Sequence, residues 1–384
     1  MTSPQTEGIG PLGGIKVIES LLCDLCAEPR LWVVSMKRIL KRIGLVLLVA
    51  LLGLAIWQHE LISYGYMQAK GQLHIMLNTR PVAEVLADAN VPDSAKVKIR
   101  LIGEIKQFAQ DSLGLDPSEN FTTFHDQEGK PLMWMLVGSD RYALTPVQFS
   151  IPLLGTFAYR GFFDKTRLLE ADSLLRKQGY DTRISGIAAY STLGFFKDPI
   201  LSSMLSRNEG DLAQLIIHEL THGTLFIKDN LEYNENLADF VGDYGAERFM
   251  AYKYGDTSAV YRDYRAGLAF WERYTQHVVR GSQLLDKIYR AFKPTTPVAV
   301  KEAMKWKTIG QIVTAADTIT DERSANRLPQ RRVSTQSKLP NNAYFVSYLT
   351  YRKQQNRFKT EFVTQFNSDF PRYLRHLKQT YPSL

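Results

Sequence analysis

The segment LIIHELTHGT, residues 215–224, constrains the fold more than any other part of this chain. Its apolar residues recur at helical spacing, which predicts a helix with one buried face. His218 and His222 are four residues apart, and on a helix that spacing directs both imidazoles to the same side. Glu219 lies between them. The segment therefore predicts a helix that presents two metal ligands and one carboxylate together.

A third metal ligand is expected a short distance further along the chain. A catalytic zinc ion usually takes three protein ligands and leaves a fourth position for water. Twelve residues lie between His222 and Glu235, enough for the first helix to end, for a turn at 228–230, and for a second helix to return alongside. Asp239 follows on the same face, where it can accept the free ring N–H of a ligating histidine. We therefore predict one Zn²⁺ per chain, held by His218, His222 and Glu235.

A HExxH string also occurs by chance in helices whose histidines are ordinary surface or core residues. The Asn-Glu pair and the aspartate at helical offsets beyond the string make chance a weaker explanation here. The other five histidines show no comparable spacing and are expected to be structural or surface residues: His59, His74, His125, His277 and His376.

Several further motifs occur in order along the chain. They are Gly71-Gln72, Tyr159-Arg160-Gly161-Phe162-Phe163, AYSTLGFFKDP at 189–199, NENLADFVGDYG at 234–245, and Pro340-Asn341-Asn342-Ala343. HELTH followed by NExxxD resembles the gluzincin metallopeptidases. The whole ordered set is similar to the bacterial family of predicted zinc aminopeptidases, which are envelope proteins. This resemblance covers about Tyr64 to the C-terminus.

The resemblance implies a zinc-dependent peptide hydrolase, an aminopeptidase, that acts in the cell envelope. The chain departs from the family at one place. Family members often carry a lipoprotein cysteine at the end of the signal sequence, whereas Leu61-Ile62-Ser63-Tyr64 contains none, so attachment by lipid is not expected. The family's name itself rests on the motif. Metal-dependent peptide hydrolysis is therefore the firmer expectation. Whether the enzyme is an exopeptidase or an endopeptidase stays open.

The N-terminal region contains an export signal. Ile43 to Trp57 is a fifteen-residue run without a polar side chain. Four basic residues precede it: Lys37, Arg38, Lys41 and Arg42. A basic segment followed by an apolar run is typical of export signal sequences. At about 1.5 Å per residue the run spans about 22 Å, and flanking apolar residues bring it nearer the thickness of a bilayer. Because no small-x-small cleavage site follows, we predict an uncleaved single-pass anchor over 36–63.

Basic residues before an anchor are expected to stay in the cytoplasm. The catalytic domain, predicted to cover 64–384, would then face the periplasm from the inner membrane. Residues 1–35 form a leader ahead of the basic cluster, and Met36 is the alternative start if that leader is not translated. The competing interpretation of the apolar run is a buried helix of a soluble protein.

Cysteine usage and charge limit the remaining possibilities. Both cysteines, Cys23 and Cys26, lie in the leader, so the exported part would contain no internal disulfide and must be stabilised by its core. The formal net charge is +8. On an exported protein, this charge favours binding to anionic lipid headgroups over binding to nucleic acid. The predicted partners are a peptide substrate and the inner membrane, with no nucleic acid; the oligomeric state is not indicated.

Periodicity along the chain predicts an α+β fold, with a small strand-rich region beside a predominantly helical, zincin-like catalytic unit. Dense β-branched and apolar residues predict strands at 131–137 and 182–188, with a helix at 165–177 between them. Long apolar periodicity predicts the other helices. These ranges are 94–113, 235–253, 260–279, 282–292, 298–318 and 344–379.

The ligand set predicts hydrolysis by a metal-activated water. Glu219, which is not a ligand, is the expected general base. The tetrahedral oxyanion needs a further donor beside the metal, and Tyr190 is the first candidate, with Arg160 and Tyr233 as alternatives. The closest alternative functions are a zinc-binding scaffold without turnover and a hydrolase of a non-peptide amide in the envelope. A structural zinc site usually has Cys or His in its fourth position, and neither lies near this motif.

Substrate binding is assigned to Arg160 and Ser191. The strand at 182–188 leads towards Ser191 and is the candidate edge to which a substrate backbone could add. An aminopeptidase must also hold a free α-amine with a carboxylate, and both Asp198 and Glu232 are candidates.

Overall fold

A computed structural model describes residues 29–151, 155–187, 197–228, 230–316, 319, 339–352 and 355–381. Most of the predicted leader, with both cysteines, lies outside these residues. Contacts divide the chain into two units, Met1–Tyr66 and Met67–Leu384.

The first unit consists, in its described part, of α2 (Pro29–Trp57) and the start of α3 (His59–Leu77). The large apolar side chains of α2 that the structure describes between Ile39 and Trp57 are exposed. Among the described residues, no single helix is long and apolar enough to cross a bilayer. The segments Ile39–Leu54 and His59–Leu77 meet that requirement of length and composition only together, as a bent pair. The anchor over 36–63 stays a prediction.

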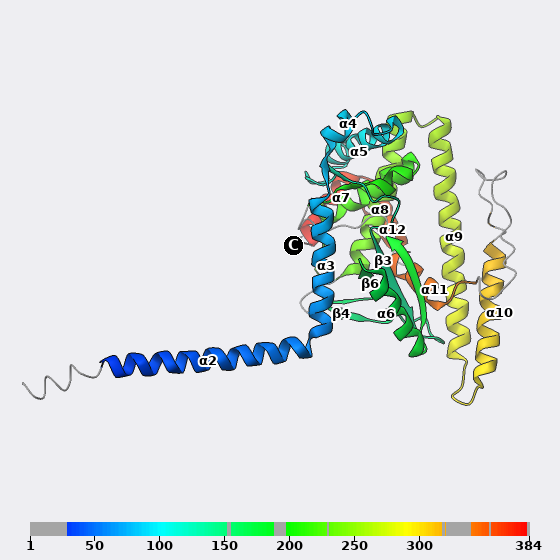
Figure 1. Cartoon of the computed structure of the whole chain (residues 1–384). Helices are drawn as coiled ribbons and strands as arrows, with labels where there is room; N and C mark the ends of the chain where they lie inside the picture. The colour runs from blue at the N-terminus through cyan, green and yellow to red at the C-terminus, as the bar shows by residue number, and fades with distance from the viewer. Residues whose placement is uncertain are drawn as a thin grey trace, which may run out of the picture. The chain divides into compact units, whose positions relative to one another are not determined.

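The second unit combines short strands with many helices (Figure 1). The strands are β1 (Arg80–Pro81), β2 (Thr123–His125), β3 (Met133–Ser139), β4 (Phe149–Ile151), β5 (Gly155–Phe157), β6 (Arg160–Phe162), β7 (Asp181–Ile187) and β8 (Ile200–Leu201). The helices are α4 (Val82–Ala87), α5 (Asp93–Asp111), α6 (Lys165–Lys177), the 3₁₀ helix η1 (Ser202–Ser206), α7 (Glu209–Thr224), α8 (Leu231–Tyr254), α9 (Ala259–Arg290), α10 (Val298–Ala316), α11 (Asn342–Arg352), α12 (Gln355–Phe366) and α13 (Phe370–Thr380). The predicted α+β class, mostly helical with small sheets, is confirmed.

The central antiparallel sheet has the strand order β6-β3-β7, and β3 pairs with β7 along the whole length of both strands. Successive side chains of β3 point to opposite faces, as the pleat requires. Val137 packs with Val346 of α11 on one face. On the other face, a Cβ at Gly138 would lie 3.2 Å from Leu175 of α6. Helices therefore cover both faces of this sheet, while β7 is an edge strand among the described strands.

The motif Gly71-Gln72 lies in the part of α3 that belongs to the second unit. A Cβ at Gly71 would lie 2.2 Å from the ring of Phe163, so only glycine permits this approach of helix and ring. The neighbouring Gln68 donates from Nε2 to the carbonyl of Gly161 at 2.8 Å. These contacts give Gly71 and the Tyr159–Phe163 motif a shared packing role next to β6.

The last motif, which contains Asn342, lies in a buried polar cluster at the start of α11. Nδ2 of Asn342 donates to the carbonyl of Arg141 at 3.1 Å, and Oδ1 accepts from the hydroxyl of Tyr289 at 2.8 Å. The side chain of Lys305 is fully buried and donates to Asp181 Oδ2 at 2.5 Å and to the Arg141 carbonyl at 3.0 Å. The buried charges are thus paired and hydrogen-bonded, and the cluster joins α9, α10 and α11 to the start of β7.

The long helix α9 differs from the expected pair of helices at 260–279 and 282–292. The chain continues as a single helix through Gly281. A Cβ there would lie 2.7 Å from Ile312 of α10, so the glycine serves close packing between the two helices and not a break. Figure 1 shows α9 and α10 side by side. The prediction of two helices was wrong because a glycine inside a helix does not by itself end it.

The single C-terminal helix predicted at 344–379 was also wrong, because the region forms α11, α12 and α13. Asn367 and Ser368 have φ angles of 51° and 60°, in the left-handed region that ends α12. Asp369 then caps α13 by accepting from the N–H of Arg372 at 3.1 Å. Local capping interactions thus override the continuous apolar periodicity.

Candidate metal centre

Helix α7 carries the HExxH residues and begins where the sequence provides a cap. Asn208 accepts a hydrogen bond from the N–H of Asp211 at 2.8 Å, which satisfies one of the free N–H groups of the first turn. Leu212, Ile216 and Leu220 are buried at helical spacing. They hold α7 in the main hydrophobic cluster with α5, α8 and α13. The opposite edge of the helix is left to present His218 and His222.

The turn between α7 and α8 is closed by Asn234. Its side chain accepts from the N–H of Ile227 at 2.9 Å and donates to the Ile227 carbonyl at 2.7 Å. Asn230 caps α8 by accepting from the N–H of Tyr233 at 3.2 Å, so the helix begins at Leu231, four residues before the predicted start. Because Asn234 is fixed to the turn, the next residue, Glu235, is directed back towards α7.

Two glycines of α8 allow the two helices to approach closely. A Cβ at Gly242 would lie 2.9 Å from the backbone carbonyl oxygen of Gln214 and 3.3 Å from Cβ of His218. A Cβ at Gly245 would lie 2.9 Å from Ile217. Any larger residue at Gly242 must therefore displace backbone beside a candidate ligand.

The close approach can be tested with Gly242→Ala. We expect the free energy of unfolding to fall by about 1–3 kcal/mol because the added methyl group overpacks the α7–α8 contact. Urea denaturation measures this. Gly310→Ala is the matched control, because Gly310 lies inside α10 with nothing within 4 Å of its Cβ position. The control should gain about 0.5–1 kcal/mol. Equal effects of the two substitutions would contradict the close-packing account.

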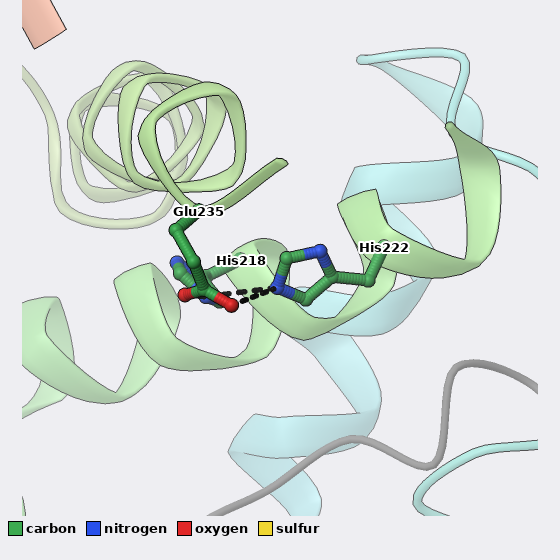
Figure 2. A group of neighbouring side chains, drawn as sticks. All are labelled: His218, His222 and Glu235. Carbon is green, nitrogen blue, oxygen red and sulfur yellow. Dashed lines mark hydrogen bonds and ion pairs between the residues drawn. The ribbon is translucent and has the colours of Figure 1, made fainter. Parts of the chain in front are cut away.

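The two histidines and Glu235 converge on one point (Figure 2). Nε2 of His218 and Nε2 of His222 are 3.2 Å apart. Oε2 of Glu235 lies 3.6 Å from the first nitrogen, and Oε1 lies 3.7 Å from the second. The ligand atoms of the three residues all lie within 4.8 Å of one another. The structure thus brings together the three residues predicted to hold a metal.

These separations fit a small tetrahedral cation. Zinc lies about 2.0–2.2 Å from nitrogen and oxygen ligands, so neighbouring ligands of a tetrahedral site are about 3.3–3.5 Å apart. The observed separations, 3.2 to 3.7 Å, are close to that value. Two imidazoles and one carboxylate also form a donor set that zinc takes in catalytic sites. The residues present therefore fit a zinc ion with one open position.

Asp239 lies behind His218, as predicted. Its Oδ1 accepts from Nδ1 of His218 at 3.0 Å. This bond fixes the hydrogen on Nδ1 and leaves the Nε2 lone pair directed towards His222 and Glu235. Burial opposes a charge on His218, but hydrogen bonds to Asp239 and Glu235 raise its pKa well above the usual value. A cation at Nε2, whether a proton or a metal, is therefore favoured at this site.

Removal of the Asp239 carboxylate is expected to weaken metal binding by about 10- to 100-fold, because the ring of His218 then loses its orientation and part of its basicity. Competition of Asp239→Ala with a chelator of known zinc affinity measures the change. Asp256→Ala removes an exposed carboxylate beyond the end of α8 and should bind zinc as tightly as the unsubstituted protein. An unchanged affinity in Asp239→Ala would rule out the orienting role.

The other two candidate ligands have the protonation states that a metal requires. Burial, followed by the charge of His218, lowers the pKa of His222 to about 4, so this imidazole is neutral at pH 7. Burial alone would raise the pKa of Glu235, but its hydrogen bond to His218 and the positive charge of that imidazole lower it. A neutral imidazole and an ionised carboxylate are both ready to donate electron pairs.

Glu219 is buried at the same site and is not one of the converging ligands. It is 8% exposed, and among the described residues its Oε2 has no hydrogen-bond partner. Burial raises the pKa of Glu219 to about 7 against the opposing charge of His218. The negative charges of Glu235, Asp198 and Asp239 add to the increase. A carboxyl group with a pKa near neutrality can both accept and return a proton.

The structure places the remaining predicted residues as follows. Tyr190 and Ser191 lie outside the described residues. Arg160 lies on β6, where its guanidinium stands over the ring of Phe162, with 5.4 Å between the guanidinium carbon and the ring centroid. Tyr233 is buried in an aromatic cluster with Phe358 and Tyr381, a packing role in the core.

Two residues near the centre were not assigned a role from the sequence. The ring of Phe226 contacts that of His222 edge-on, with 6.2 Å between the ring centroids. Asn234 closes the turn described above. Its position directly before Glu235 was a usable signal, because asparagine side chains commonly bond to nearby backbone in turns. No local signal marked Phe226, whose contact depends on how the chain leaves α7.

Comparison with known proteins identifies the family of this chain. Residues 63–381 match the family model described as "Putative aminopeptidase". The match begins before the second unit and includes every residue of the candidate metal centre. No curated protein and no solved structure matched the chain. Because the model covers most of the chain, this protein belongs to the putative aminopeptidase family.

Proposed function

We propose that this protein is a zinc-dependent peptide hydrolase, an aminopeptidase, that acts in the cell envelope. The observation that carries the proposal is the convergence of two Nε2 atoms and one carboxylate at separations of 3.2 to 3.7 Å, with Glu219 buried beside them. The family match supports peptide hydrolysis as the reaction.

His218, His222 and Glu235 would hold the ion. Zinc bound there would supply a Lewis acid that lowers the pKa of a coordinated water towards about 7 and polarises a carbonyl. Asp239 keeps His218 in the tautomer that donates through Nε2. The burial of His222 and Glu219 keeps bulk water away, which strengthens each electrostatic interaction at the site.

Glu219 moves the protons of the reaction. Its Oε2, which has no partner among the described residues, takes a proton from the attacking water and returns it to the nitrogen of the leaving amine. The developing oxyanion needs a donor in addition to the metal, and Tyr190 is the proposed donor. Arg160, on β6, and Ser191 are proposed to contact the substrate. The proposed edge for addition of an extended substrate strand is β7, at the opposite edge of this sheet from β6.

We place this reaction at the periplasmic face of the inner membrane. The support is the apolar run of α2 with the basic residues before it. Expression of the full chain, fractionation of membranes and protease treatment of spheroplasts test the location. Cleavage of the second unit from outside the spheroplast is the expected result, and protection of that unit would contradict a periplasmic location.

The function is tested by zinc content and peptide hydrolysis of the purified chain against a mixed peptide library, with products identified by mass spectrometry. One zinc per chain and the stepwise loss of single N-terminal residues, abolished by a chelator and restored by zinc, are expected. One zinc with no cleaved peptide would favour a non-peptide amide as substrate or a zinc-binding scaffold. A chain that binds no zinc would overturn the ligand assignment.

A further inference from the structure

The first two turns of α10 expose their apolar side chains. Val298, Val300 and Met304 are 64%, 44% and 40% exposed, and Ala299 and Ala303 are exposed between them. A helix on the surface of a soluble protein ordinarily directs such side chains towards the core and its polar side chains towards water. We call the exposed surface of these five residues the α10 tip. It has the composition of a contact surface and not of a face in water.

The charged side chains of the same two turns are used inside the protein. The ammonium group of Lys301 lies over the ring of Phe292, 5.9 Å from its centroid. Glu302 accepts a hydrogen bond from Nε of Arg141 at 2.8 Å. Lys305 is fully buried in the polar cluster described above. Rotation of the helix to hide its apolar residues would break these contacts, so the fold itself keeps the α10 tip exposed.

The turn that leads into α10 is closed by local hydrogen bonds. The N–H of Thr296 donates to the carbonyl of Lys293 at 2.9 Å, and the N–H of Lys293 donates to Oγ1 of Thr296 at 2.9 Å. The carbonyl of Pro297 then accepts from the N–H of Val300 at 3.0 Å. Figure 1 shows this turn in yellow, where it joins the ends of α9 and α10. The α10 tip is therefore held in a fixed conformation at the end of a helical hairpin.

Basic residues precede and follow the α10 tip along the chain. Residues 287–307 contain six basic residues and one acidic residue, the glutamate that is bonded to α10's neighbour in the polar cluster. Lys287, Lys293 and Lys307 are exposed. Lys307 lies three residues after Met304, a spacing that places both on the same face of the helix. The apolar surface is thus accompanied by positive charge.

This combination fits an anionic lipid surface. Aliphatic side chains can enter the boundary between headgroups and acyl chains, while lysines stay level with the anionic headgroups. A second copy of the chain fits less well, because it would bring the same positive charges against the first set. Nucleic acid would attract the lysines but would leave the valines and the methionine in water.

We propose that the α10 tip docks on an anionic membrane surface, as a contact separate from the predicted anchor over 36–63. Val298, Val300 and Met304 enter the lipid, and the exposed lysines bind the headgroups. The contact holds the second unit against the bilayer in one orientation. It depends neither on the metal centre nor on hydrolysis.

The test places a fluorophore on the α10 tip of the full chain through Ala299→Cys, after Cys23→Ser and Cys26→Ser have removed the native thiols. The chain is reconstituted in vesicles of phosphatidylcholine and phosphatidylglycerol that contain a spin-labelled lipid. We expect the lipid to quench this fluorophore. Thr314→Cys is the matched label, because it is exposed on the same helix about 22 Å further along and should not be quenched. Vesicles of phosphatidylcholine alone should quench the first label less.

A substitution beside the label tests the contribution of the α10 tip itself. Val298→Asp adds a negative charge in the first turn of α10, where a helix tolerates an acidic residue, so the fold should be kept. Docking on vesicles that contain phosphatidylglycerol should weaken by about fivefold or more. Val97→Asp is the matched control, because Val97 is a 56% exposed valine on α5, and it should leave the quenching unchanged.

Three results would overturn the proposal. They are no quenching of the label at Ala299→Cys, equal quenching of the two labels, and equal quenching with and without phosphatidylglycerol. A bifunctional thiol reagent that joins two chains through Ala299→Cys, without quenching by lipid, would assign the α10 tip to a second copy of the chain instead.

Discussion

Glu219→Gln is expected to lower kcat for peptide hydrolysis by about 10²- to 10⁴-fold while zinc stays bound at one ion per chain. The amide has the shape of the carboxyl group but cannot take a proton from water. Glu219 is buried and does not belong to the converging ligands, so its substitution should leave the metal affinity intact. Steady-state kinetics and zinc analysis on the same preparation measure both quantities.

The control for this prediction is Glu247→Gln, on the far half of α8, where the carboxylate is paired with Arg265. Its kcat should be that of the unsubstituted chain. Full hydrolysis by zinc-loaded Glu219→Gln would exclude Glu219 as the general base. Loss of zinc from the variant would instead show that Glu219 helps to hold the ion.

His222→Ala is expected to abolish both zinc binding and hydrolysis. The substitution removes one of three ligands, and the remaining two cannot hold a tetrahedral ion at comparable affinity. Zinc affinity should fall by more than the factor of about 10 to 100 that is typical when a residue that only orients a ligand is removed. Zinc per chain after dialysis, together with hydrolysis at saturating peptide, measures the effect.

His59→Ala provides the matched control, because His59 is an exposed histidine outside the second unit, with 71% of its side-chain surface accessible. That variant should retain one zinc and full activity. The fold of His222→Ala can be checked by circular dichroism, because a misfolded variant would lose zinc for another reason. Retention of zinc in a folded His222→Ala protein would show that the ion binds elsewhere.

The sequence was most informative where structure depends on residues close together in the chain. The spacing of His218 and His222 is a property of a single helix, and so is that of Glu235 and Asp239. The helix at 165–177 was predicted with its observed limits, and in the structure Asp164 caps it by accepting from the N–H groups of Thr166 and Arg167. Strands β3 and β7 were located to within two residues.

Predictions failed where packing against distant residues decided the outcome. Gly281 would end many helices, yet α9 continues because Ile312 of α10 fills the space above it. The break between α12 and α13 depends on Asn367 and Ser368 adopting left-handed backbone angles, which apolar periodicity does not indicate. The packing role of Tyr233 likewise depends on α12 and on the residues after α13.

The sequence by itself determined which groups the candidate centre offers, namely two imidazoles and the carboxylates of Glu219, Glu235 and Asp239, because helical spacing fixes which side chains share a face. Only the tertiary structure decided that the two helices approach closely enough to bring these groups together, through Gly242 and the turn held by Asn234. Local spacing is encoded in a few bonds, whereas such long-range approaches depend on the packing of the whole core.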